Sequence, residues 1–252
     1  MASINLKEVG VDIPIFDISA RSFKVNVFYG VRKKISNQRI ETAANGILIV
    51  KALSGINLSL EDGDRVGLIG RNGAGKSTLL RVLAGIYEPT QGIIEIRGTT
   101  IPLLDLALGM DDEATGYQNI FLRGMLLGRS RKEIQSVLGE IESFTELGDY
   151  LSLPIRTYSS GMRLRLAFAI STAFRPEVLL LDEVIGVGDA TFLHKANIRL
   201  REFRDAAKIV VVSSHSNDVI REMCNKVLWM HEGKIKLFGP TSEVLSAYCQ
   251  ES

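Results

Sequence analysis

One short stretch of the sequence, residues 70–78, constrains the fold more than any other. It follows an apolar run at residues 66–69 that has the character of a strand, and it leads into an apolar run with the character of a helix. Its spacing is glycine, four residues, then Gly-Lys-Ser, as in a phosphate loop, where backbone N–H groups turn inward around phosphate oxygens. An ordinary glycine-rich turn between strand and helix is the alternative. The phosphate loop predicts nucleoside triphosphate binding by Gly70, Asn72, Gly73, Ala74, Gly75, Lys76, Ser77 and Thr78.

Two side chains of this loop and two acids further along the chain predict how the triphosphate is bound and hydrolysed. Lys76 would reach the β and γ phosphates, and the Ser77 hydroxyl would hold Mg²⁺. Asp182 and Glu183 directly follow an unbroken apolar run at residues 178–181, where a parallel sheet delivers side chains to a ligand. Asp182 is therefore a candidate ligand of Mg²⁺, and Glu183 is the candidate base for the attacking water. Adjacent acids after a strand are also common in turns, and the phosphate loop is what favours the chemical role.

Composition and charge narrow the class of protein. With 252 residues, of which 46% are hydrophobic, the chain can bury one large core or a core with a smaller subdomain. The formal net charge of +1 gives no bulk attraction to nucleic acid, so no nucleic-acid partner is expected. Two cysteines are too few for a disulfide framework, which favours a reducing compartment, the cytoplasm. No stretch approaches about 18 uninterrupted apolar residues, so any link to a membrane is expected through a partner.

The order of strand-like and helix-like segments predicts an α/β protein. Strand patterns flank the phosphate loop, and they return near the C-terminus in alternation with helices, as a parallel sheet requires. Between them, residues 99–170 have a helical texture, and Ser130 with Glu133 has the spacing of a capping box. This segment is expected to be a helical insertion. The expected strands are residues 4–13, 47–50, 56–60, 92–98, 178–181 and 209–212, followed by a hairpin at 227–237 and a final helix.

A second turn of small residues is Ser159-Ser160-Gly161, which precedes an apolar stripe at helical spacing. Small residues at a helix N-terminus form a potential phosphate site, because the N–H groups and the helix dipole attract anions. The alternative is an ordinary serine cap on a helix, and the three residues alone favour that alternative.

The motifs stand in an order that resembles the ATP-binding cassette (ABC) ATPases. A phosphate loop, a helical insertion and a serine-glycine turn are followed by a strand ending in Asp182 and Glu183, then by a strand before His215. The resemblance covers nearly the whole chain. It implies that residues 159–161 belong to the signature sequence and contact nucleotide, that Asp189 is the D-loop acid, and that His215 contacts the γ phosphate. A lone histidine after a buried strand is otherwise more often a structural residue.

The resemblance also implies an architecture and an assembly. The fold would be a P-loop NTPase (RecA-like) core with an N-terminal antiparallel β-subdomain and an inserted α-helical subdomain. Residues 1–252 would form a single ABC ATPase domain, with residues 1–98 and 171–252 in the core and residues 99–170 in the helical subdomain. Two copies would pair head to tail, each phosphate loop closing on the signature of the other, with ATP between them.

Where the sequence departs from the common pattern of the family, it resembles the sequences of one subfamily. Ser160 and Met162 replace the usual glycine and glutamine of the signature, Gly-Val-Gly precedes Asp189, and no glutamine begins a Q-loop. Residues 103–110 instead resemble the Leu-Leu-Glu-Leu-Gly segment of the exporters of bacterial polysaccharides, the O-antigen and teichoic acid exporters. The N-terminal pattern of that subfamily implies that Phe16 stacks on adenine, with Tyr29 as the reserve candidate.

Membership of that subfamily implies a function. The chain would hydrolyse ATP with Mg²⁺ on the cytoplasmic side of the bacterial inner membrane, with a second copy of itself and an integral-membrane permease dimer as partners. The cargo would be a lipid-linked polysaccharide. The sequence ends at Ser252 without the C-terminal carbohydrate-binding domain that subfamily members often carry, so substrate choice is expected to rest with the permease.

Three other functions compete with polysaccharide export. One is an ABC transporter subunit for another cargo. Another is a soluble ABC-type ATPase acting on ribosomes or DNA, although such proteins usually carry two cassettes or a long coiled coil. The third is a small-molecule kinase, which would not explain the order of the motifs after the phosphate loop.

Overall fold

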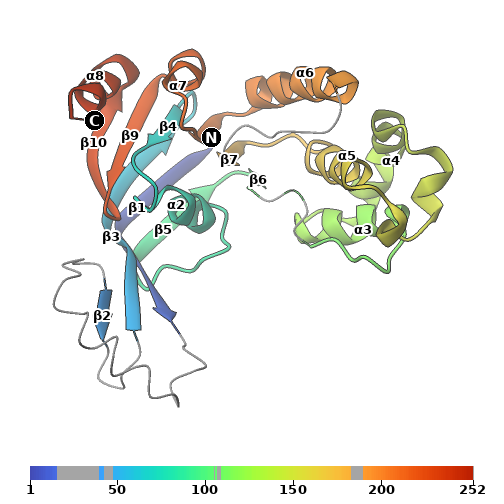
Figure 1. Cartoon of the computed structure of the whole chain (residues 1–252), viewed down its shortest axis with the longest axis horizontal. Coiled ribbons are helices and arrows are strands. Elements are labelled where there is room, and N and C mark those ends of the chain that lie inside the picture. Colours follow the sequence, from blue (N-terminus) through green and yellow to red (C-terminus); the bar gives the residue numbers. More distant parts are fainter. Residues whose placement is uncertain (16–39, 43–47, 105, 107–108, 183–189, 252) are drawn as a thin grey trace.

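Two β-sheets organise the chain in the computed structural model, which describes every residue except 16–39, 43–47, 105, 107–108, 183–189 and 252 (Figure 1). The N-terminal sheet has four antiparallel strands in the order β2-β3-β1-β5, so the expected antiparallel β-subdomain is confirmed. Its strands are β1 (Ser3–Ile15), β2 (Ile40–Thr42), β3 (Leu48–Glu61) and β5 (Gln91–Arg97).

The second sheet has six strands in the order β10-β9-β4-β8-β7-β6. Its neighbouring strands are parallel except for β10, which pairs antiparallel with β9 in the expected hairpin. The strand that leads into the phosphate loop, β4, lies inside the sheet between β9 and β8. The strands are β4 (Arg65–Ile69), β6 (Thr100–Leu103), β7 (Val178–Asp182), β8 (Ile209–Ser213), β9 (Lys226–His231) and β10 (Lys234–Pro240).

The central strands are buried on both faces, as their unbroken apolar runs predict. Along β7, Val178 and Leu180 pack in a core shared with the N-terminal sheet and α2 (Lys76–Leu83). The alternate residues Leu179 and Leu181 pack in a second core shared with the helices beyond the sheet. Side chains alternate between the faces of a strand, and burying each of these valines or leucines stabilises the fold by about 1.5–3 kcal/mol. The sheet is therefore the common wall of two cores.

Three helices gather at one end of the molecule, away from β2 (Figure 1). They are α3 (Gly116–Leu126), α4 (Arg131–Thr145) and α5 (Ser160–Ser171), and the two short 3₁₀ helices η2 (Gly148–Ser152) and η3 (Ile155–Thr157) precede α5. The capping box predicted for α4 is confirmed, because Ser130 Oγ accepts from Glu133 N and a Glu133 carboxylate oxygen accepts from Ser130 N at 2.8 Å. The other helices in the described part of the chain are α6 (Ala190–Ala206), α7 (Asn217–Met223) and α8 (Thr241–Glu251).

The helical insertion was expected to begin at residue 99, and this was wrong at its first residues. Residues 100–103 form β6, which pairs in parallel with β7 at the end of the sheet. Ile101 and Leu103 are buried, and they alternate with Thr100 and Pro102. Proline lacks the N–H that a ladder needs but is tolerated in an edge strand, so it hides such a strand from sequence analysis.

Candidate nucleotide-binding site

The phosphate loop connects the C-terminal end of β4 to the first residue of α2, as predicted. Gly70 has φ +139°, and a Cβ there would lie 2.3 Å from the Met230 carbonyl oxygen. Gly75, the cap residue of α2, has φ +107°, and its Cβ would lie 3.1 Å from the Ala52 carbonyl oxygen. Only glycine adopts such conformations without strain, so both positions need glycine for backbone geometry and for close packing against β9 and β3.

Lys76 is buried at the start of α2 with its ammonium group folded over the loop. Its Nζ donates to the carbonyl oxygens of Gly70 at 2.6 Å and Arg71 at 3.3 Å. No acidic residue stands in the first turn of α2. The N-terminal end of the helix, with its partial positive charge, and the ammonium group thus form an electropositive site suited to a phosphate chain.

A cavity of about 740 Å³ extends from the phosphate loop across the carboxyl ends of the parallel strands. Asp182 ends β7 and stands opposite Ser213 of β8 in the sheet register, while His215 follows β8 and is exposed. Parallel strands deliver their C-terminal residues to one edge, which is why segments far apart in sequence meet here. The cavity is lined by Asn72, Gly73, Ala74, Gly75, Lys76, Ser77, Thr78, Asp182, Ser213 and His215, together with Ile13, Ile40, Val50, Ala52 and Leu104.

The residues present fit a bound Mg²⁺. The Ser77 hydroxyl and the Asp182 carboxylate, the two predicted ligands, line the same cavity. Across the described parts of the chain, no group of three or more histidine, cysteine, aspartate or glutamate side chains is placed to hold a metal. The two oxygen donors at Ser77 and Asp182 suit Mg²⁺, because this ion takes one or two protein oxygens and completes its shell with water and substrate phosphates.

An aliphatic wall of the cavity was missed by the sequence analysis. Ile13 of β1, Ile40 of β2, and Val50 and Ala52 of β3 line the cavity on the side of the N-terminal sheet. The apolar alternation of residues 47–50 predicted a strand there, but nothing local showed that its side chains would face the phosphate loop. The predicted adenine contact, Phe16, lies outside the described residues, as does Tyr29.

The serine-glycine turn, residues 159–161, lies away from the cavity at the phosphate loop. Ser159 caps α5, because its Oγ accepts from Met162 N at 3.2 Å, and Ser159 and Ser160 are exposed. Tyr158 anchors the turn by donating to the Tyr150 carbonyl oxygen at 2.6 Å, and burial raises the pKa of its hydroxyl. Neither serine nor Gly161 is among the residues that line the cavity. The structure therefore does not bring the serine-glycine turn to the phosphate loop of the same chain.

Two further predicted residues, Glu183 and Asp189, lie outside the described residues. Within the described part of the chain, no helix has the length and apolar character needed to cross a membrane.

Comparison with known proteins agrees with this geometry. Residues 53–186 match the family model described as ABC transporter. The O-antigen export system ATP-binding protein RfbE of Yersinia enterocolitica is 43% identical over 235 residues, which cover 93% of this chain and 97% of RfbE. RfbB of Myxococcus xanthus, from another O-antigen export system, is 41% identical over 79% of this chain but only 46% of its own length. TagH of Listeria innocua, a teichoic acids export ATP-binding protein, is 40% identical over 78% of this chain and 58% of its own length.

Solved structures share the fold at lower identity. The ATP-binding subunit of an ABC transporter aligns over 98% of this chain and 93% of its own, with a TM-score of 0.68 and 20% identity. The ATP-binding cassette MJ0796, solved as a dimer bound to ADP and Pi, aligns over 94% of this chain and 98% of its own, with a TM-score of 0.64 and 19% identity. Fold, motif order and sequence similarity agree, and the chain belongs to the ABC transporter family.

Proposed function

We propose that this chain is the ATP-hydrolysing subunit of a bacterial exporter that drives a lipid-linked polysaccharide outward through a membrane permease. The cargo proposal is supported by RfbE, an O-antigen export ATP-binding protein that aligns with this chain over nearly its whole length. The chain spans only about half the length of the other relatives, RfbB and TagH, which are named for O-antigen and teichoic acid export. It would work at the cytoplasmic face of the inner membrane, docked on a permease dimer, as a single ATPase domain with α3, α4 and α5 in its helical subdomain.

One observation supports the assembly. The cavity gathers the phosphate loop, Asp182 and His215 from one chain, whereas the exposed Ser159 and Ser160 at the N-terminal end of α5 do not line it. A second copy, placed head to tail, would bring its own α5 N-terminus to the open side of the cavity. The triphosphate would then lie between Lys76 of one chain and Ser159 and Gly161 of the other, with its charge shared by two helix N-termini.

Each of the predicted site residues has its own role in hydrolysis. Lys76 would exchange its contacts with the loop carbonyls for the β and γ phosphate oxygens, and Ser77 and Asp182 would hold Mg²⁺. When bound, Mg²⁺ neutralises charge that develops on the phosphates. Glu183 orients and deprotonates the attacking water, and His215, at the cavity, contacts the γ phosphate.

Two proposed contacts complete the site. Asp189 would lie beside the nucleotide at the junction between the two copies. Phe16 would stack on the adenine, as the N-terminal pattern of the subfamily implies.

The assembly is tested by sedimentation of the Glu183→Gln chain, in which bound ATP persists. We expect a monomer without nucleotide and a dimer with Mg·ATP, while turnover falls at least about 100-fold. Adding Lys76→Ala to Glu183→Gln should abolish dimerisation because the triphosphate is no longer held. A Glu183→Gln chain that stays monomeric with saturating Mg·ATP, alone and with the permease, would contradict the assembly. Turnover equal to that of the unmodified chain would contradict the role of Glu183.

A further inference from the structure

The loop at residues 111–115 and the segment at residues 153–157 are far apart in sequence but are joined along their length. Ile155 N donates to the Ala114 carbonyl at 3.0 Å, Arg156 N donates to the Asp112 carbonyl at 3.0 Å, and Gly116 N donates to the Leu153 carbonyl at 3.2 Å. An antiparallel bridge between Thr115 and Pro154 lies in the same place. The second segment leads directly into the Ser159 turn, so the first loop is the support on which that turn is built.

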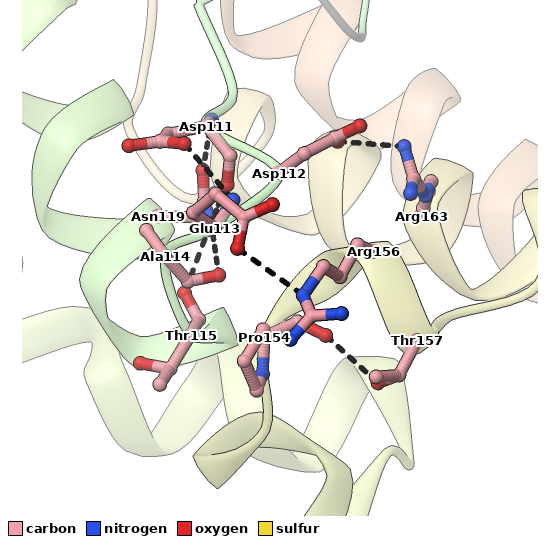
Figure 2. A network of polar contacts seen from close by, with 10 residues as sticks. All are labelled: Asp111, Asp112, Glu113, Ala114, Thr115, Asn119, Pro154, Arg156, Thr157 and Arg163. Carbon is pink, nitrogen blue, oxygen red and sulfur yellow. Dashed lines mark hydrogen bonds and ion pairs between the residues drawn. The ribbon is translucent and has the colours of Figure 1, made fainter.

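The loop at residues 111–115 is itself held in place by one buried side-chain amide, that of Asn119. Asn119 of α3 is fully buried, and its side-chain oxygen accepts from Asp111 N at 2.8 Å. Its Nδ2 donates to the carbonyl oxygens of Asp111, Ala114 and Thr115 at 2.9, 3.1 and 3.0 Å (Figure 2). A buried side chain that satisfies four backbone groups fixes the path of the 111–115 loop.

Two ion pairs join this loop to both sides of the serine-glycine turn. Asp112 pairs with Arg163 at 2.7 Å, and Glu113 pairs with Arg156 at 3.2 Å (Figure 2). Arg156 precedes the turn, while Arg163 lies in the first turn of α5, where its backbone N donates to the Ser159 carbonyl at 3.0 Å. The two arginines therefore flank Ser159, and both are tied to neighbouring acids of one rigid loop.

The contribution of these two ion pairs to the stability of the fold is small. The side chains of Asp112 and Glu113 are 60% and 77% exposed, and exposed ion pairs contribute little to folding. Each pair does restrict the orientation of the backbone that carries its arginine, because a guanidinium group bonded to a carboxylate of the fixed loop has few other positions. The orientation that they restrict is that of the α5 N-terminus.

We infer that the pairs Asp112–Arg163 and Glu113–Arg156, named here the signature clamp, orient the Ser159–Gly161 turn toward the nucleotide held by a second copy of the chain. The inference rests on the proposed head-to-tail dimer. The four residues are positioning residues that act through Ser159 and Gly161, and they touch neither the phosphate loop nor the cavity of their own chain.

The test measures the dissociation constant of the Mg·ATP dimer in the Glu183→Gln background. Asp112→Asn removes one charge with little change of shape, and Arg163→Gln removes the charge from the other side of the pair. A dimer contains two clamps, so a loss of about threefold at each appears as about a tenfold rise in the dissociation constant. Binding of a fluorescent ATP analogue to the monomer should be unchanged, because the phosphate loop is intact. The reversed pair, Asp112→Arg with Arg163→Asp, should recover most of the loss.

Lys208→Gln is the control, since Lys208 forms a partly exposed ion pair of similar length with Glu177, at 2.6 Å. That pair lies where β7 and β8 begin, at the opposite edge of the sheet from the cavity, and its loss should leave dimerisation unchanged. If the single variants dimerise like the parent chain, the inferred role of the signature clamp is wrong, while the proposed function is unaffected. A reversed pair as weak as the single variants would also overturn the clamp. A parent chain that fails to dimerise with Mg·ATP would overturn the proposed assembly and the clamp together.

Discussion

At the scale of single residues, Lys76 is the side chain on which nucleotide binding depends most. Its buried ammonium group rests on two loop carbonyls, and these are weaker partners than phosphate oxygens. We expect Lys76→Ala to weaken ATP binding about 100-fold, which corresponds to about 2–3 kcal/mol for charged hydrogen bonds. Titration with a fluorescent ATP analogue measures this loss.

Arg81→Ala is the control for Lys76→Ala. It removes one positive charge from the last turn of the same helix, where the guanidinium lies 5.8 Å from the centre of the Tyr87 ring. ATP binding should change less than about threefold, because an exposed charge this far along the helix is screened by solvent. Equal losses in both variants would mean that net charge, rather than the position of the ammonium group, holds the nucleotide.

The two cysteines differ in environment, and this predicts their reactivity. Cys224 is buried behind β4, and burial raises the pKa of its thiol to about 12, whereas Cys249 is exposed. The thiolate is the reactive species, so at pH 8 a thiol reagent should label Cys249 quickly and Cys224 only after unfolding. In Cys249→Ser the folded chain should stay nearly unlabelled. Rapid labelling of that variant while it is folded would show that α7 moves readily off β4, which it covers.

At the scale of elements, α3 and α4 cross so closely that one glycine is required. A Cβ at Gly124 of α3 would lie 2.6 Å from Ile134 Cγ1 of α4. Overpacking costs about 1–3 kcal/mol, while alanine gains up to about 1 kcal/mol over glycine in helix propensity. Gly124→Ala should therefore lower the free energy of unfolding by about 1 kcal/mol, as measured by urea denaturation.

Gly139 of α4 is the matched control for Gly124. It is exposed, and a Cβ there would meet nothing within 4 Å. Gly139→Ala should therefore raise the free energy of unfolding by about 0.5–1 kcal/mol through helix propensity alone. If both substitutions stabilised the chain equally, the helices would be able to move apart at no cost.

At the scale of the whole molecule, the proposed function predicts what happens in the cell when ATP is bound but not hydrolysed. Replacing the chain by Glu183→Gln should leave finished lipid-linked polysaccharide in the cytoplasmic leaflet, because a permease that is not driven does not complete transport. Surface labelling of polysaccharide, compared with total polysaccharide after lysis, measures this. Intact surface polysaccharide together with accumulation of a small solute inside the cell would keep the ATPase and refute the cargo.

Much of the fold was predictable because it depends on patterns within a few residues. The phosphate-loop spacing, the Ser130 capping box and the buried run of β7 all require particular side chains close together in sequence. The edge strand β6 was missed because Pro102 weakens the local strand pattern, and pairing with β7 decided its structure instead.

The sequence by itself determined the family, the alternation of strands and helices around the phosphate loop, and the spacing of that loop, since each depends on residues close together in the chain. Only the tertiary structure decided that Ile40 and Val50 line the cavity, that Ser159 does not, and that Asp112 meets Arg163. These are contacts between segments far apart in the chain. Such contacts form only when the sheets and helices pack, so no local pattern of residues encodes them.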